Sequence, residues 1–419
     1  MSDSDWHVDS NGEAANFKDI LRVTVILTGN ENFGIARFLL NQWTESRRFG
    51  IQFGYVCLQH GIMTDALQSA GADVTVCHGV VPQLSRLWPV LAWMLWFAPF
   101  GGFWSTLSKV IHELRAIAPD VVYTQNLPGH LLGGLAGRRL HLGTMGQIHG
   151  SLNEKRMLGL TRRMVSVLLY ALFARGIAIS NYVRQTLWGP ARRKTEVVYN
   201  SVDVRAIQDA APRASKVPGR LVMVGRLVPL KKFETAIEAV LILTRQGVSC
   251  SLDIIGGPVD VSNGYFMRLK RLVEESGLKD RVSFWGVLSP PYLHVASAEV
   301  FISCATIEGF GYAVVEAMAC GTPVVVADAG APAEYVVDGC SGLQFRSDDP
   351  SSLARRLKGL LGNSDQRVRI AAAAREQVEK LFPPDQHMAG IRRTAEAVAA
   401  RTRLWNRTQP RTQGESIQS

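Results

Sequence analysis

The stretch TIEGFGYAVVEAMACGTPVVVAD, from Thr306 to Asp328, compresses a glycine-containing loop, a short helix and a buried strand into one segment. It follows the apolar run EVFISCA, which predicts a strand that ends near Ala305. Strand, loop, helix and strand in succession are typical of a parallel α/β sheet, in which ligands bind beyond the carboxyl ends of the strands. Glu308 in the loop and Glu316 in the apolar helix are therefore expected near a ligand.

The same alternation extends from Leu21 through the quoted stretch, with one interruption at residues 209–219, DAAPRASKVPG, whose prolines and small residues are typical of a linker. We predict an α/β protein with two doubly wound, Rossmann-like domains that face each other across a cleft. The predicted parts are a mobile tail at 1–20, a first domain at 21–207, a linker at 208–218, a second domain at 219–384, a terminal helix at 385–403 and a mobile tail at 404–419.

The net charge of +10 is concentrated in one part of the 419-residue chain. Residues 138–194 contain 11 Lys and Arg residues and the single acid Glu154, a surplus equal to that of the whole chain. Such a block predicts an anionic partner, either a membrane surface, a phosphate-bearing ligand or nucleic acid, although a solvated basic face would explain any single charge in it. The neighbours of Arg162 and Arg163 are apolar and do not form a stacking platform, so nucleic acid is not expected.

No charged residue lies between Arg86 and Lys109, a segment rich in tryptophan. Prolines and a glycine pair interrupt it, so it falls short of the roughly 20 apolar residues of a membrane-spanning helix. It is either an interfacial element with tryptophans at headgroup depth or a core helix, and the basic block after it favours the membrane. The candidates for membrane or acceptor contact are Trp88, Trp93, Trp96, Arg162 and Arg163.

The amino-terminal residues are polar and lack the apolar region of a signal peptide. The six cysteines are scattered and form no CxxC pair, which favours reduced thiols over a disulfide or zinc framework. We therefore expect a cytoplasmic protein that is peripheral to the inner face of the cell membrane.

Cations and glycines follow two strands of the predicted second domain. Arg226 and Lys231 come shortly after the apolar run LVMVG, and such cations suit a diphosphate. Gly309 and Gly311 permit close approach of the backbone to a ligand, and the free N–H groups of the following helix suit phosphate or sugar hydroxyls. Paired glutamates alone are weak evidence, since buried acids more often cap or pair within a protein.

The run Glu308-Gly-Phe-Gly, followed by Glu316-Ala-Met-Ala-Cys-Gly-Thr-Pro-Val-Val, resembles the E-x7-E signature of retaining glycosyltransferases of family 4, the glycosyl transferases group 1 family. The sequence Gly225-Arg226-Leu227, with Lys231, resembles the diphosphate motif of this family, and His149-Gly150 resembles a motif of its first domain. These motifs occur in the family's order over nearly the whole chain.

The resemblance implies a GT-B fold, in which the second domain binds the donor nucleotide sugar, the first binds the acceptor and the terminal helix crosses back to the first. Arg226 and Lys231 would then neutralise the leaving diphosphate, Glu316 would hold the ribose and Glu308 the donor sugar, while His149 would lie near the anomeric carbon. The implied catalytic residues are His149, Arg226, Lys231 and Glu308. The implied donor-binding residues are Gly34, Gly225, Gly257, Gly309, Phe310, Gly311 and Glu316.

The expected activity is transfer of a hexose, with retention and without metal or other cofactor, from a UDP- or GDP-linked sugar to a lipid-linked or polysaccharide acceptor of the cell envelope. Two departures from the family pattern are Asn32-Phe33-Gly34 in place of a glycine pair, and Lys232 in place of a glycine. They leave open a GT-B binding or scaffold subunit with little turnover. An epimerase or phosphorylase of the same architecture is a third, weaker possibility.

Overall fold

The computed structural model describes residues 20–31, 33–79, 102–151, 159–211, 214–258 and 264–408. Trp88, Trp93 and Trp96 lie outside the described residues, as do most of both predicted tails and the side chain of Arg162. Gly34 lies in the first helix, Phe33–Ser46. Among the residues that the structure describes, no helix is long and apolar enough to cross a membrane.

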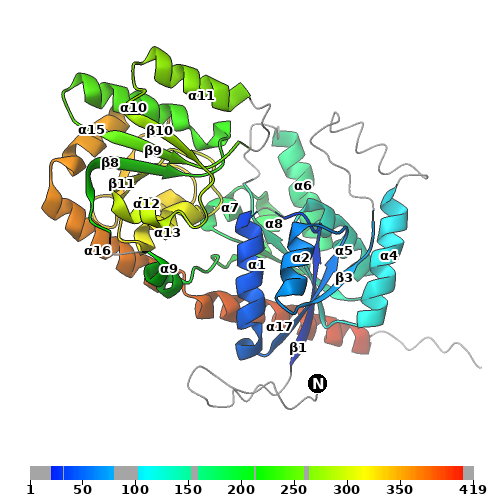
Figure 1. Cartoon of the computed structure of the whole chain (residues 1–419). Helices are drawn as coiled ribbons and strands as arrows, with labels where there is room; N and C mark the ends of the chain where they lie inside the picture. Colours follow the sequence, from blue (N-terminus) through cyan, green and yellow to red (C-terminus); the bar gives the residue numbers. More distant parts are fainter. Residues whose placement is uncertain are drawn as a thin grey trace, which may run out of the picture.

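The first domain is built on a seven-stranded parallel sheet with strand order β3-β2-β1-β4-β5-β6-β7 (Figure 1). Its central strands β4 and β5 are buried along their whole length, as expected for a parallel sheet that helices cover on both faces. The strands are β1 (Leu21–Leu27), β2 (Ile51–Cys57), β3 (Asp73–Val76), β4 (Val121–Thr124), β5 (Gly143–Ile148), β6 (Arg175–Ala178) and β7 (Thr195–Val197).

Glycine-rich helix α5 shows how the sequence sets the packing around this sheet. Asn126 caps the helix by accepting a hydrogen bond from the main-chain N–H of Gly129 at 2.9 Å. A Cβ at Gly133 would lie 2.6 Å from Cγ2 of Thr124, so glycine allows the helix to lie directly on β4. The helices of this domain are α1 (Phe33–Ser46), η1 (Arg47–Phe49), α2 (Ile62–Ser69), α4 (Gly102–Ile117), α5 (Leu127–Arg139), α6 (Gly159–Leu172), α7 (Asn181–Gln185), α8 (Gly189–Arg193) and α9 (Val204–Ala210).

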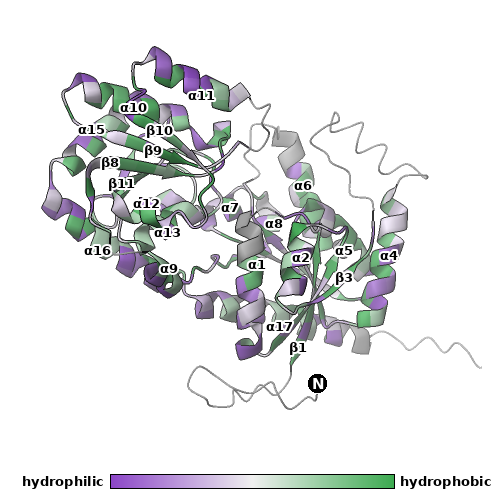
Figure 2. Ribbon diagram, in the orientation of Figure 1, coloured by the Kyte–Doolittle hydropathy of each residue, from purple (hydrophilic) through white to green (hydrophobic). Residues whose placement is uncertain are grey.

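The second domain repeats the pattern with a six-stranded parallel sheet of order β10-β9-β8-β11-β12-β13. Hydrophobic residues concentrate on its strands, and hydrophilic residues lie mainly on the outer helices (Figure 2). Its strands are β8 (Val217–Val224), β9 (Ser251–Ile255), β10 (Val282–Gly286), β11 (Ala298–Ser303), β12 (Val324–Ala327) and β13 (Leu343–Phe345). Its helices are η2 (Pro229–Lys231), α10 (Phe233–Arg245), α11 (Gly264–Glu275), α12 (Tyr292–Ser297), α13 (Tyr312–Ala319), α14 (Pro332–Tyr335), α15 (Pro350–Leu361) and α16 (Ser364–Leu381).

Two doubly wound, Rossmann-like domains are thus confirmed. The boundaries differ in detail, because α9 and β8 both extend into the predicted linker at 208–218. All six cysteines are free thiols, but Cys340 is exposed and does not belong to the core.

The last helix, α17 (Pro384–Thr408), returns to the first domain and lies beneath its sheet (Figure 1). Met388, Ile391 and Val398 are buried in the same cluster as Val23 of β1. A Cβ at Gly143 of β5 would lie 2.5 Å from Cγ1 of Val398, so the helix crosses the strand in close contact. The helix continues to Thr408, beyond the predicted range 385–403.

The two domains share an aromatic cluster where α16 gives way to α17. The ring of Phe382 lies edge-on to Phe310 and Tyr335 of the second domain, with centroids 5.1 Å apart in each pair, and to Tyr199 of the first domain at 5.5 Å. The main-chain N–H of Val202 also donates to the carbonyl of Phe382 at 3.0 Å. The segment of the first domain near Val202 and the segment near Phe382 that leads back to this domain are therefore in contact.

Candidate functional site at the domain junction

The loop before α13 is held in one conformation from both sides. Gly311 has φ = 89°, in the left-handed region that favours glycine, and a Cβ there would lie 2.9 Å from the hydroxyl of Tyr335. That hydroxyl donates to the main-chain oxygen of Phe310 at 2.8 Å. The start of α13 is therefore a rigid platform whose first N–H groups are available to a ligand.

The side chain of Phe310 lies in the protein interior, only 2% exposed. It packs against Tyr312 and Phe382 at centroid distances of 4.8 and 5.1 Å. The side chain thus supports the loop from the core. Only the main chain of Phe310 could have the predicted donor-binding role.

Lys231 and Glu308 form an ion pair between the loops that follow β8 and β11. Both side chains are mostly buried, with 26% and 18% of their surface exposed. Gly225 lies against this lysine, since a Cβ there would be 3.5 Å from Cε of Lys231, and Gly257 accepts a hydrogen bond from the main-chain N–H of Leu227 at 3.0 Å. The structure thus brings together four residues that the sequence placed in one site.

Arg226 precedes Lys231 by five residues, and its side chain is exposed. Its guanidinium makes no hydrogen bond or ion pair with any residue that the structure describes. A guanidinium fork with no partner among the described residues and a partly buried ammonium together suit the oxygens of a diphosphate.

Lys232 replaces the glycine that the family pattern has after the lysine. Its backbone is left-handed, with φ = 54° and ψ = 45°, at the residue that precedes α10. Such a conformation costs an ordinary residue roughly 1–2 kcal/mol, which explains the usual glycine. Nζ of Lys232 lies 2.8 Å from Oδ1 of Asp348, and this hydrogen bond raises the pKa of the lysine.

Glu316 lies in the second turn of α13 and is half-buried. Its charge contributes, after burial, to raising the pKa of Cys320 to about 12. The ribose-binding role of Glu316 stays a prediction.

His149 follows β5 and comes to the junction from the first domain. Its Nε2 lies 2.6 Å from Oε1 of Gln125, a residue that follows β4 and is 2% exposed. Because an amide oxygen only accepts, Nε2 carries the proton and Nδ1 is left as an acceptor. Burial, with a smaller contribution from His387, lowers the pKa of His149 to about 3, so the ring is neutral at pH 7.

The two halves of the site are in direct contact. A Cβ at Gly309 would lie 2.5 Å from the main-chain oxygen of His149, so only glycine fits there without a shift. Oε2 of Glu334, which belongs to α14, accepts hydrogen bonds from the hydroxyl of Tyr199 at 3.0 Å and from the main-chain N–H of Asn181 at 3.1 Å. The carboxyl ends of both sheets therefore meet at one place.

Sequence reasoning missed two features of the first domain's part of the site. Gln125, which orients His149, belongs to no recognisable motif. Glu31 lies in the loop after β1, where one oxygen accepts from the N–H of Thr28 at 2.6 Å and from the amide of Asn126 at 2.7 Å. The Asn-Leu-Pro-Gly start of α5 was the available signal, since it marks a capped helix at a strand end.

Of the membrane and acceptor candidates, the structure describes only the side chain of Arg163, which is exposed on α6. Trp104, from the same uncharged segment as the other tryptophans, lies in α4 and is 52% exposed. The part of the chain that is described contains no group of three or more His, Cys, Asp or Glu residues that could hold a metal ion. Metal independence stays a prediction.

Two family models match adjoining parts of the chain, Glycosyltransferase Family 4 over residues 63–206 and Glycosyl transferases group 1 over residues 205–377. The D-inositol 3-phosphate glycosyltransferase of Stackebrandtia nassauensis is 36% identical over 160 residues, which are 36% of this chain and 35% of the relative. The GDP-mannose-dependent alpha-(1-6)-phosphatidylinositol monomannoside mannosyltransferase of Mycobacterium tuberculosis is 32% identical over 167 residues, 38% of this chain and 42% of the relative. Each match spans less than half of the relative's length.

The crystal structure of Anabaena HepE in complex with UDP matches the fold with a TM-score of 0.74 at 19% identity, over 90% of this chain and 100% of that chain. The two domains and the junction between their carboxyl edges define a protein of the GT-B class. Within that class, the matches to the two family models and the ordered motifs support a glycosyltransferase of the group 1 type.

Proposed function

We propose that the protein is a retaining, metal-independent glycosyltransferase that moves a sugar from a UDP- or GDP-linked donor to a hydroxyl of a lipid-linked or polysaccharide acceptor. The observation that carries this proposal is the pairing of Lys231 with Glu308, whose neighbour Gly309 lies against the main chain of the neutral His149 of the other domain. The exposed guanidinium of Arg226, which has no partner among the described residues, adds a second cation. These are the residues that a reaction releasing a diphosphate needs.

The ion pair suggests how the donor is received. A diphosphate competes with the carboxylate of Glu308 for Lys231 and adds bidentate hydrogen bonds from Arg226. The lysine then neutralises charge on the leaving group, while Glu308 is free to accept hydrogen bonds from donor-sugar hydroxyls. Such stabilisation by positioned cations lowers the barrier because the diphosphate charge grows as the glycosidic bond breaks.

The contribution of the first domain to the proposed reaction is the neutral ring of His149. Gln125 holds the Nε2 proton, so Nδ1 and the ring edge are presented without positive charge. A neutral imidazole does not repel the positive charge that develops at the anomeric carbon. This behaviour matches the position near that carbon that the family resemblance implies.

The class of acceptor rests on the relatives and on charge. The Stackebrandtia nassauensis and Mycobacterium tuberculosis relatives are named for inositol 3-phosphate and for phosphatidylinositol monomannoside, both phosphate-bearing polyols. The basic block at 138–194 in the first domain suits an acceptor with a phosphate or a membrane that contains it. We therefore propose action on an anionic acceptor at the inner face of the cell membrane.

A matched pair of variants tests the mechanism. The donor for the assay is the UDP- or GDP-linked sugar that gives the largest thermal shift. Lys231→Ala removes the partly buried cation, and we expect the rate of nucleotide release from this donor to fall at least a hundredfold. Lys279→Ala removes a lysine whose partner is also a glutamate, Glu274 at 3.0 Å, but in an exposed pair on the second domain. It should keep full activity.

The product's anomeric configuration, measured by NMR, decides retention. Full activity in a folded Lys231→Ala protein would overturn the mechanism. The alternative of a scaffold subunit with little turnover predicts donor binding without release of nucleotide, in the presence or absence of acceptor.

A further inference from the structure

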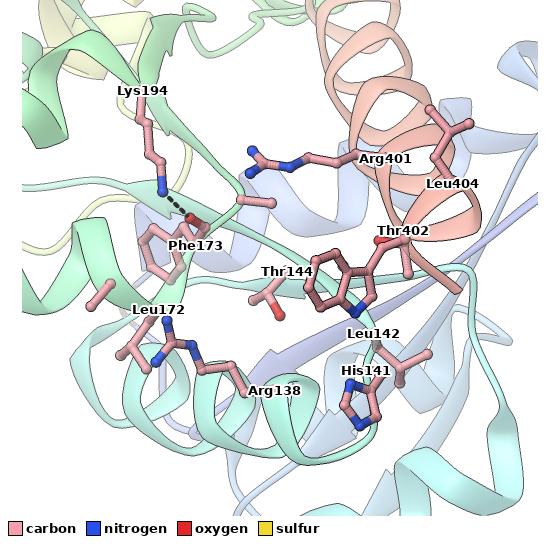
Figure 3. A pocket seen from close by; sticks show the side chains of 14 residues that line it. Arg138, His141, Leu142, Thr144, Leu172, Phe173, Lys194, Arg401, Thr402 and Leu404 are labelled. Atoms are coloured by element: carbon pink, nitrogen blue, oxygen red, sulfur yellow. Dashed lines mark hydrogen bonds between the residues drawn. The ribbon is translucent and has the colours of Figure 1, made fainter. Parts of the chain in front are cut away.

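A second candidate ligand site lies at the opposite edge of the first domain's sheet. A cavity of about 600 Å³ opens where β5 begins, between the ends of α5 and α6 and the last turns of α17 (Figure 3). His149 follows the other end of β5, which at about 3.3 Å per residue is roughly 20 Å away. The cavity is therefore separate from the site at the domain junction.

The charge of this cavity is of one sign. Arg138 from α5, Lys194 from the turn before β7 and Arg401 from α17 line it, and its lining contains no Asp or Glu. Figure 3 shows the nitrogen ends of Lys194 and Arg401 directed towards each other across the cavity. Burial, followed by the charges of Arg401, Arg138 and Arg175, lowers the pKa of Lys194, so the fields of these cations overlap.

Hydrogen bonds hold the side chain of Lys194 in place, whereas the side chains of the two arginines have no such partners among the described residues. Nζ of Lys194 donates to the main-chain oxygens of Tyr170 and Phe173, each at 3.0 Å. The guanidiniums of Arg138 and Arg401 make no hydrogen bond or ion pair with any described residue. Clustered cations repel one another, and an anion placed between them would remove this cost.

The base of the cavity holds a polar group without a partner. The side chain of Thr144, on β5, lines the cavity and is 3% exposed. Its Oγ1 has no hydrogen-bond partner among the described residues, but it is inaccessible and faces α5, where a Cβ at Gly137 would lie 2.3 Å away. Contacts with a ligand in the cavity are therefore left to the three cations.

Apolar side chains border the charged part. Leu404 and Trp405, both in the cavity lining, are 64% and 56% exposed at the end of α17. A ligand that combines a phosphate with an apolar portion would use both kinds of surface.

We propose that this cavity binds the phosphate group of an anionic ligand, with Arg138 and Arg401 as planar donors on either side and Lys194 as a fixed third cation. The phosphate belongs either to an anionic lipid headgroup or to a soluble phosphate ester. The inference is independent of sugar transfer, because it uses no residue of the domain junction.

The test compares two double variants that remove the same charge. Arg138→Ser with Arg401→Ser removes the two guanidiniums of the cavity that have no partner among the described residues. Arg192→Ser with Arg193→Ser removes two exposed arginines of α8 that belong to the same basic block but not to the cavity. All four positions are exposed, so both proteins should fold, which circular dichroism and thermal unfolding check.

Two probes distinguish the sources of the phosphate. Sedimentation with phosphatidylcholine vesicles, with and without phosphatidylglycerol, tests the lipid headgroup. Calorimetric titration with inorganic pyrophosphate tests a soluble phosphate, in full-length protein that also carries Lys231→Ala to weaken the donor site.

We expect the cavity variant to bind at least tenfold more weakly in one of the two assays, and the α8 variant to change binding less than threefold. Loss with vesicles identifies a lipid ligand, and loss with pyrophosphate identifies a soluble one. Equal losses in both variants would assign binding to the diffuse charge of the block and overturn the proposal. Absence of binding to either probe would overturn it too.

Discussion

Acid should destabilise this protein steeply, because three histidines of the first domain are held in the neutral form. His387 of α17 shows the effect most directly, since it is 2% exposed and burial lowers its pKa to about 4. Its Nδ1 lies 2.7 Å from the main-chain oxygen of Tyr199, and its Nε2 lies 3.0 Å from Nε2 of Gln42. His130 is also buried and His149 is half-buried, and desolvation lowers the pKa of each to about 3.

The sign and size follow from proton linkage. An unfolded histidine has a pKa of about 6.5, so below that pH the unfolded chain binds a proton that the folded protein does not. Stability is therefore lost as the pH falls from 6.5 towards 4. Between pH 7 and pH 5, His387 alone costs about 2 kcal/mol, and His130, His149 and His387 together cost about 5–6 kcal/mol. A domain's whole stability is typically about 5–15 kcal/mol.

The assay is urea unfolding at pH 7 and pH 5, followed by circular dichroism, for the wild-type protein and for His387→Gln. The raised pKa of Glu334 acts in the opposite direction, so the informative quantity is the difference between the proteins. His387→Gln should lose about 2 kcal/mol less than the wild type over this pH range. The control is His112→Gln, an exposed position on α4, which should keep the wild-type pH dependence. Equal losses in wild type and His387→Gln would refute the reasoning.

Three further substitutions probe the domain junction. Gly309→Ala should lower the thermal unfolding temperature and reduce kcat/KM at least tenfold, because its Cβ would lie 2.5 Å from a main-chain oxygen of the other domain. The control is Gly150→Ala, which has nothing within 4 Å of its Cβ and should leave the unfolding temperature unchanged. Equal effects of the two substitutions would contradict this prediction. Lys232→Gly stabilises the folded state by relieving a left-handed backbone, but it removes an ion pair and increases the entropy of the unfolded chain. These effects oppose each other, so the unfolding free energy should stay within about 1 kcal/mol of wild type. A loss above about 2 kcal/mol would show that no strain was relieved. Tyr335→Phe removes the hydroxyl that holds the oxygen of Phe310, which should cost about 1–3 kcal/mol in urea unfolding because a buried acceptor is left unpaired; an unchanged stability would argue against this anchor.

The sequence was sufficient for most of the fold, because its strands are continuous apolar runs and its helices have an apolar face. Strand β13, from Leu343 to Phe345, was not predicted, since three residues are too few to establish a pattern. The end of α17 was placed too early, because Leu404 and Trp405 are helix-compatible but contact solvent rather than a core.

The site was predicted to the extent that its residues belong to local motifs. Lys231 and Glu308 lie far apart in the sequence, yet each follows a strand of a parallel sheet, and such positions meet at one edge. Gln125 could not be found in this way, since its role depends on the adjacency of β4 and β5 and on one side-chain geometry. The presence of Arg138 and Arg401 in one cavity depends on the return of α17, which brings residues of the last helix to the end of α5.

The return of α17 also has a consequence for how the protein is made. Residues such as Met388, Ile391 and Ala395 complete the core that begins with Leu21 and Val23. On the ribosome, the first domain's strands emerge long before this helix. Helices α1 and α2 cover part of one sheet face, but the part that α17 packs against stays uncovered while the entire second domain is translated. The second domain, in contrast, has its strands and covering helices in one continuous stretch. It can therefore reach its native structure during synthesis, whereas the domain synthesised first is the last to finish folding.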